Sequence, residues 1–143
     1  MANALQLETQ SSKISLPGWA LTEVPVNVPT QAVETVRADI LTSLTPANEK
    51  EFAVAMVPLF DWAETFGLAT QDRAKAVKYY CQAMSEIPAD LVNAAVKRVT
   101  TGWKWGNRMP LPSDLRDAVP DAYADRKLAL MNLDRAIEKR KER

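Results

Sequence analysis

From Thr30 onward, apolar residues recur at the 3.6-residue spacing of an amphipathic helix, and prolines, glycines and capping residues interrupt this pattern at short intervals. Runs of β-branched residues are few and only four glycines are present, which disfavours a sheet protein. The chain is therefore predicted to be all-α, with about five to six helices in a small domain. The expected spans are residues 30–43, 46–66, 71–86, 88–101, 112–119 and 121–142.

Individual residues indicate where these helices begin and end. Thr45 followed by Pro46 offers an N-cap with a proline at the first helical position, and Thr70 offers an N-cap for the next helix. Gly67 is expected to end the helix between them in the left-handed conformation. Pro58 lies inside that helix and removes a backbone hydrogen bond, so a kink or break is expected there. The apolar stripe of the same helix comprises Phe52, Met56, Leu59, Phe60, Ala63 and Phe66, and that of residues 88–101 comprises Leu91, Ala94, Ala95 and Val99.

The two ends of the chain differ from its middle. Residues 1–28 show neither helical nor strand periodicity and are predicted to form a flexible tail. Trp19 in this segment either folds back onto the domain or belongs to a short motif for a partner. Residues 29–120 are predicted to form the helical domain. Residues 121–143 are predicted to form a projecting charged C-terminal helix or an interaction arm.

Composition narrows the class of protein. Apolar residues make up 47% and charged residues 25% of the chain, as in ordinary globular proteins. The formal net charge is zero, so any attraction to nucleic acid must be local. A single cysteine fits a reducing compartment, and neither a secretory signal nor a membrane-spanning apolar run is recognisable. A cytoplasmic protein that contacts no membrane is therefore predicted.

Groups able to perform catalysis are scarce. The sequence has no histidine, no G-x-S-x-G motif and no phosphate-binding G-x-x-x-x-G-K motif, and Cys81 has no histidine to activate it. Asp121 and Asp125 are spaced as on one helix face, but carboxylates at a helix start are typical stabilisers of its dipole. We therefore predict that the chain is not an enzyme and binds neither a metal nor a cofactor.

The main charge asymmetry lies between Asp90 and Asp114, where no acidic residue occurs. Two tryptophans occupy the same stretch and either fill a gap between helices or stack on a base or a partner side chain. The segment 109–112 is expected to be a rigid elbow, because its prolines fix the backbone. The candidate nucleic-acid or partner-binding residues of this stretch are Lys97, Arg98, Trp103, Lys104, Trp105 and Arg108.

A second set of candidate residues lies at the C-terminus. Between residues 134 and 143 the chain carries five basic and three acidic side chains. This end is either a solvated helix terminus, where cations complement the helix dipole, or an arm that becomes ordered on a partner. The candidate partner-binding residues are Arg135, Lys139, Arg140, Lys141 and Arg143.

Four features follow one another over about residues 52 to 120: a tyrosine-bearing helix, a leucine-proline-like break, a basic helix and a Pro-x-Pro elbow. The residues that form them are Tyr79 and Tyr80, Ile87 and Pro88, Val96 to Arg98, and Pro110 and Pro112. This order resembles the small helicase-loader proteins of tailed phages, of the loader-and-inhibitor type and more remotely of the lambda type. Two departures occur, because Met109 replaces the aromatic residue that usually precedes the first proline and Leu111 replaces a capping serine or threonine.

The resemblance implies a non-catalytic DNA-replication adaptor in the cytoplasm of a bacterial host cell. Such a phage protein binds a hexameric replicative helicase, an ATPase, and recruits, loads or restrains it. Single-stranded DNA or a replication initiator are further partners of this class. Two alternatives remain open from the residues: a small nucleic-acid-binding module that uses the basic and aromatic loop, and a phage-encoded inhibitor that occludes a host protein.

Overall fold

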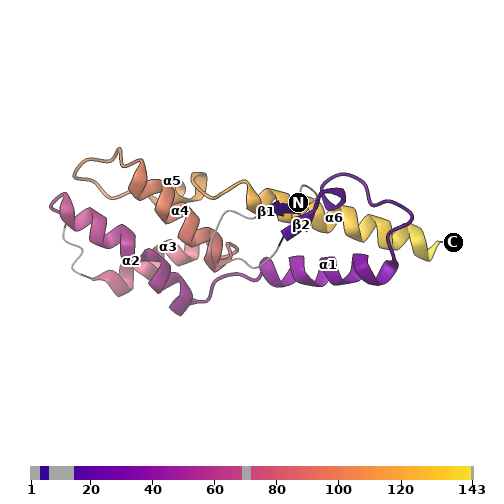
Figure 1. Cartoon of the computed structure of the whole chain (residues 1–143). Helices are drawn as coiled ribbons and strands as arrows, with labels where there is room; N and C mark the ends of the chain where they lie inside the picture. The colour runs from indigo at the N-terminus through magenta and orange to yellow at the C-terminus, as the bar shows by residue number, and fades with distance from the viewer. Residues whose placement is uncertain (1–3, 7–14, 69–71, 143) are drawn as a thin grey trace. The chain divides into compact units, whose positions relative to one another are not determined.

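The computed structural model describes residues 4–6, 15–68 and 72–142 (Figure 1). Six α-helices dominate this part of the chain and confirm the predicted all-α class. No helix within it is long and apolar enough to cross a membrane. The helices are α1 (Thr30–Ser43), α2 (Glu49–Thr65), α3 (Arg73–Ala83), α4 (Ala89–Thr101), α5 (Pro112–Asp117) and α6 (Ala122–Lys141). Two short strands, β1 (Ala4–Gln6) and β2 (Ser15–Pro17), pair antiparallel, and a 3-10 turn, η1 (Gly18–Ala20), follows them.

The chain forms two compact units. Unit 1 combines the residues up to Thr45 with those from Asp121 on, and unit 2 comprises Pro46–Pro120. This division differs from the predicted single domain over residues 29–120. The reason is that α1 packs against α6, which brings the C-terminal helix into a unit with the first helix.

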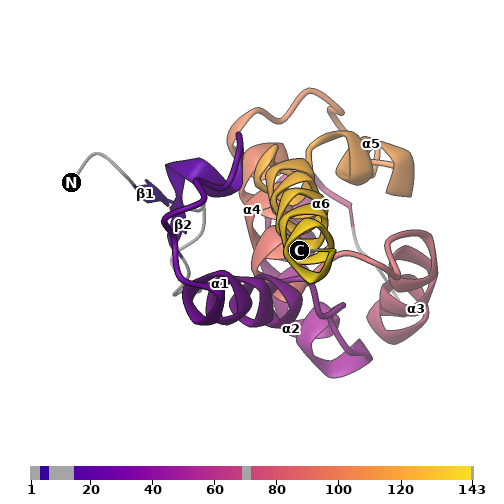
Figure 2. The same ribbon diagram turned by 90° about the vertical axis from the view of Figure 1, so that its right-hand side faces the viewer.

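Unit 1 is built on the antiparallel pair of α1 and α6, which lie side by side in both views (Figures 1 and 2). The C-terminal end of α1 meets the start of α6, where Arg126 Nη1 donates a hydrogen bond to Ser43 O at 2.7 Å. At the opposite end, Arg140 Nη1 donates to Thr30 Oγ1 at 3.0 Å. The predicted projecting helix is thus attached along α1. Its buried residues are Ala122, Arg126, Ala129 and Leu133.

The segment predicted as a tail also contributes to unit 1. Leu16 and Ala20 are fully buried, and Asn132 Nδ2 donates to Ala20 O at 3.0 Å. Trp19 in η1 is half-buried, as expected if the tryptophan folds back onto the domain. A few isolated apolar residues therefore bury themselves without the periodicity by which a helix or strand is recognised.

Unit 2 places α2 against both α3 and α4, and α5 against α3 and α4. Its core contains Phe52, Met56, Leu59, Phe60, Leu91, Val92, Val96, Val99 and Leu115. The short helix α5 begins with Pro112 at its first turn, as predicted for the elbow.

Two of the predicted features of α2 differ from the structure. Its N-cap is Asn48, in a capping box where the Asn48 side chain accepts from Glu51 N and Glu51 Oε1 accepts from Asn48 N. The helix therefore begins after the predicted Thr45–Pro46 pair, because the box satisfies two backbone donors at once. Of the kink or break predicted at Pro58, the break is absent, because the helix continues through this residue. Val54, whose carbonyl Pro58 leaves without its helical donor, is 66% exposed.

Two other predictions concern the loop between α2 and α3. Gly67 has a φ of 81° directly after the C-cap of α2, which confirms the predicted left-handed ending. The predicted cap Thr70 lies outside the described residues. The N-cap that the structure shows for α3 is Asp72, whose side chain accepts from Lys75 N at 3.0 Å.

Candidate partner-binding site

Four aromatic side chains form a continuous strip on unit 2. Trp62 and Phe66 come from the end of α2, and Trp103 and Trp105 come from the loop after α4. The rings of Phe66 and Trp103 are stacked, with centroids 5.4 Å apart and planes inclined by 4°. Trp62 contacts Phe66 at 5.9 Å, and Trp103 contacts Trp105 edge-on at 5.5 Å. We refer to Trp62, Phe66, Trp103 and Trp105 as the aromatic strip.

Hydrogen bonds fix the loop that carries half of the aromatic strip. Trp103 Nε1 donates to Gly106 O at 3.0 Å across a turn in which Gly106 has a φ of 58°. Trp105 Nε1 donates to Asp114 Oδ2 at 3.1 Å, and the same oxygen accepts from Leu111 N at 2.8 Å. Asp114 therefore joins the loop to the start of α5. The two tryptophans are held in place before any partner binds.

The exposure of the aromatic strip changes along its length. Trp62 and Phe66 are 41% and 40% exposed, whereas Trp103 and Trp105 are half-buried. Phe66 was predicted on the apolar stripe of its helix, but the helix ends there and the ring turns toward Trp103 instead. Trp62 was not singled out by sequence, because it lies off that stripe. Large apolar side chains exposed together are typical of protein-interaction surfaces.

The predicted cations do not all join the aromatic strip. Lys104 Nζ lies 5.6 Å from the ring centroid of Trp105, in a cation–π contact. Arg98 Nη1 donates to Ala118 O at 3.5 Å, and Arg98, Lys104 and Trp105 line a shallow cavity of about 250 Å³. Lys97 is exposed on α4. Arg108 is exposed in the loop, where its backbone N–H donates to Trp105 O at 3.0 Å.

An ion-pair cluster occupies another face at the end of α2. Arg73 Nη2 lies 2.6 Å from a carboxylate oxygen of Glu64 and 3.2 Å from one of Asp61. Because successive residues of a helix are about 100° apart, these two carboxylates lie roughly 100–160° around α2 from Trp62 and Phe66. The cluster therefore does not border the aromatic strip.

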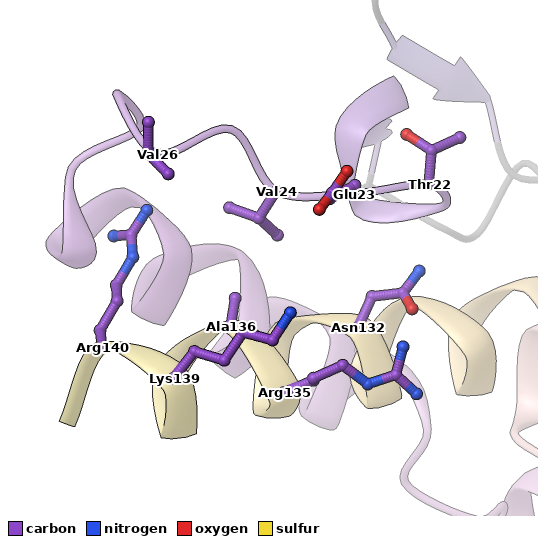
Figure 3. Close-up of a pocket in the computed structure, with 9 residues that line it drawn as sticks. All are labelled: Thr22, Glu23, Val24, Val26, Asn132, Arg135, Ala136, Lys139 and Arg140. Carbon is purple, nitrogen blue, oxygen red and sulfur yellow. The ribbon is translucent and has the colours of Figure 1, made fainter. Parts of the chain in front are cut away.

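The C-terminal candidate residues belong to unit 1. Arg135, Lys139 and Arg140 line a groove between α6 and residues 22–26, shown in Figure 3. Lys141 Nζ lies 3.8 Å from Glu138 Oε1, in an exposed ion pair. Arg143 lies outside the described residues. The structure therefore brings together three of these five predicted residues.

Among the described residues, no cluster of three or more histidine, cysteine or carboxylate side chains could hold a metal ion. Burial raises the pKa of the Cys81 thiol, and the nearby Glu49 carboxylate adds to the effect. A thiol with a raised pKa is a poor nucleophile at neutral pH.

Tyr80 provides a pH-dependent link between α3 and the elbow. Its hydroxyl donates to Pro110 O, and its side chain is 5% exposed. Burial first, and the charge of Asp114 second, raise the pKa of Tyr80 to about 12. The folded state thus favours the neutral phenol. The contribution of the neutral Tyr80 phenol to the free energy of unfolding is fully present below pH ~10, the ordinary pKa of tyrosine. It is lost as the pH rises through the raised pKa of the folded state.

Replacing Tyr80 with phenylalanine is expected to remove the most alkaline step of tyrosine ionisation, measured by ultraviolet absorbance. The melting temperature of the variant should also fall less steeply than that of the parent chain when the pH is raised from 10 to 12. Tyr79→Phe is the matched control, since Tyr79 is the neighbouring residue and is 62% exposed. Persistence of the alkaline step in Tyr80→Phe would contradict the assignment.

Comparison with protein-family models, with curated proteins and with solved structures finds no match to this chain.

Proposed function

We propose that this chain is a non-catalytic adaptor that binds a protein partner through the aromatic strip, and that the partner is a hexameric replicative helicase. The observation that carries the adaptor role is the exposure of Trp62 and Phe66 at the end of α2, where the Phe66 ring stacks on Trp103 of an ordered loop. The helicase is suggested by the resemblance of residues 52–120 to phage helicase loaders. The adaptor would act in the cytoplasm of a bacterial host and recruit, load or restrain the helicase.

The aromatic strip has the physical properties of an interface centre. Tryptophan is strongly enriched among residues that dominate binding energy, and ordered rings lose little conformational entropy when a partner covers them. Phe66 and Trp103 already support each other by stacking, with centroids 5.4 Å apart. Lys104 is exposed and its Nζ lies 5.6 Å from the ring centroid of Trp105, so it provides a polar group at the edge of the strip. An apolar centre with a polar rim is typical of protein–protein interfaces.

The double substitution Trp62→Ala and Phe66→Ala is expected to weaken partner binding by about 30-fold or more, the effect of losing an interface hot spot. The full chain is mixed with purified replicative helicases of bacterial and phage origin. Complex formation is measured by light scattering after size exclusion, and the effect on ATP hydrolysis is measured in parallel. Tyr79→Ala is the control, because Tyr79 is an exposed aromatic residue of unit 2 that lies outside the aromatic strip.

Two outcomes would contradict this proposal. If no replicative helicase binds the full chain, the partner has been wrongly assigned. If a helicase binds the double variant as tightly as the parent chain, the interface lies elsewhere. Restoration of binding by Trp62→Phe with Phe66→Tyr would show that the aromatic surface itself is needed, whereas Tyr79→Ala should bind like the parent.

Nucleic-acid binding is a second candidate function, favoured by the contact of Lys104 with the Trp105 ring at 5.6 Å. A base could stack beside Trp105 while four cations contact phosphates. These cations are Lys97, Arg98, Lys104 and Arg108. If four phosphates are neutralised, the logarithm of the affinity for single strands should change with the logarithm of the salt concentration by a slope of about −3. Titration of the intrinsic tryptophan fluorescence with oligonucleotides at several salt concentrations measures this slope. Undetectable or salt-independent binding would exclude this mechanism.

The third candidate, occlusion of a host protein, would use the same exposed aromatic surface. Co-purification of the full chain with a bacterial lysate, followed by identification of proteins lost with the double variant, separates the two protein partners. Recovery of a replicative helicase supports the adaptor, and recovery of another host protein supports the inhibitor.

A further inference from the structure

The groove of unit 1 is a second candidate binding site, separate from the aromatic strip. Its cavity volume is about 380 Å³. One wall is the C-terminal half of α6 and the other is the segment of residues 22–26, as Figure 3 shows. We define the basic groove by the residues of α6 and of this segment that line it, chiefly Glu23, Val24, Val26, Arg135, Lys139 and Arg140.

Hydrogen bonds hold the segment wall of the basic groove in place at both ends. Asn132 Nδ2 donates to Ala20 O at 3.0 Å on one side of the segment. On the other side, Arg140 Nη2 donates to Pro25 O at 3.2 Å and Arg140 Nη1 to Thr30 Oγ1 at 3.0 Å. The groove is therefore open between two fastened points. Its shape does not depend on a ligand.

The charge of the basic groove is strongly unbalanced. Arg135, Lys139 and Arg140 contribute three positive charges, and Glu23 contributes the one negative charge among the lining residues. Arg140 is used in fastening the segment, whereas Arg135 and Lys139 are exposed on α6. These two side chains are four residues apart on one helix, so they lie about one turn, or roughly 6 Å, from each other along its axis.

The same spacing occurs in an extended peptide. Alternate side chains of an extended chain point to one side and repeat at roughly 6.6 Å. Two acidic side chains at positions i and i+2 of such a peptide would therefore match Arg135 and Lys139. Val24, Val26 and Ala136 offer apolar contacts along the same groove, and Val26 is 80% exposed. The groove thus combines paired cations with apolar lining.

We propose that the basic groove binds an extended acidic peptide of a partner protein, with acidic residues at every second position and apolar residues between them. A protein ligand is favoured over nucleic acid because none of the nine residues that line the groove is aromatic, so none can stack on a base. This inference does not depend on the proposed function, because it concerns unit 1, whereas the aromatic strip belongs to unit 2.

The test uses the full chain and a fluorescein-labelled peptide in which three aspartates alternate with valines between glycine ends. Binding is followed by fluorescence anisotropy at low and high salt. Affinity for the peptide should fall as the salt concentration rises, because the groove cations are exposed. A control peptide with asparagine in place of each aspartate should bind at least about tenfold more weakly.

Variants locate the site on α6. Arg135→Glu combined with Lys139→Glu is expected to weaken peptide binding by about tenfold or more, while Arg135→Lys combined with Lys139→Arg retains it. Lys141→Glu is the matched control for Lys139→Glu, since Lys141 lies on the same helix but outside the groove. Circular dichroism confirms that each variant is folded. If the double glutamate variant is not folded, Arg135→Gln combined with Lys139→Gln replaces it.

Four results would overturn the proposal. They are no binding of the peptide up to about 1 mM, equal binding of the asparagine peptide, a loss on Lys141→Glu equal to that on the double glutamate variant, and tighter binding of a thymidine oligonucleotide that competes with the peptide. Failure of the chain to bind any helicase would not affect the outcome, because the probe is the peptide alone.

Discussion

Replacing Arg126 with alanine is expected to lower the free energy of unfolding of unit 1 by about 3 kcal/mol. Arg126 is fully buried, and its guanidinium donates to Ser43 O at 2.7 Å. Ser43 is the last residue of α1, so its carbonyl belongs to the group of helix-end carbonyls that lack a helical donor. The positive charge also complements the negative end of the α1 dipole. The variant would lose the hydrogen bond to the Ser43 carbonyl, the positive charge at the end of α1 and the packing of a long side chain together.

Urea unfolding followed by circular dichroism measures this loss. Arg135→Ala is the matched control, because it removes the same side chain from an exposed position on the same helix, and a change within about 0.5 kcal/mol is expected. Tryptophan fluorescence indicates which unit is affected, since three of the four tryptophans belong to unit 2. Equal losses in the two variants would mean that the burial of Arg126 does not stabilise the end of α1.

The sequence predicted the helices well because each helix has local determinants. Apolar spacing located the helical segments, and Gly67 ended α2 in the left-handed conformation as expected. The start of α2 was displaced from the Thr45–Pro46 pair to Asn48, although the Asn-x-x-Glu pattern of a capping box was present in the sequence. Local signals thus compete, and the sequence alone does not say which one is used.

The pairing of helices could not be predicted in the same way. A periodic stripe shows that one face of a helix is buried, but it does not identify the partner that covers it. The partnership of α1 with α6 depends on contacts between residues that are far apart in the chain, such as Arg37 with Asp134 at 2.5 Å. Arg126 is a further example, because an arginine on a helix is ordinarily expected to be exposed.

Only part of the candidate site was predicted from the sequence, again because contacts between distant segments of the chain cannot be read from residue spacing. Trp103 and Trp105 were noticed because two tryptophans stand out within a short basic loop. Trp62 and Phe66 became recognisable only when the fold placed α2 beside that loop. Their contact joins segments separated by more than thirty residues, and no spacing rule covers such a distance.

Leu91→Ala provides the second large expected effect and tests the core of unit 2. The structure places Leu91 on the buried face of α4, where it is 0% exposed, together with Ala95 and Val99 as the sequence predicted. Ala94, which was also predicted on this face, is only half-buried. The substitution is expected to destabilise unit 2 by about 2–4 kcal/mol, because it removes buried methyl groups and leaves a cavity between α4 and its neighbours. Tryptophan fluorescence during urea unfolding reports this change.

Asn93→Ala is the matched control for Leu91→Ala, because Asn93 is exposed on the opposite side of the same helix. Its effect should stay within about 0.5 kcal/mol.

The buried face of α4 is wider than predicted, since Val92 and Val96 are also buried, with 0% and 2% exposure. This width follows from the position of α4, which packs against both α2 and α5. A loss below about 1 kcal/mol on Leu91→Ala would mean that the surrounding side chains collapse into the cavity that the substitution leaves. The double variant Leu91→Ala with Val96→Ala would then show whether α4 contributes to the core at all.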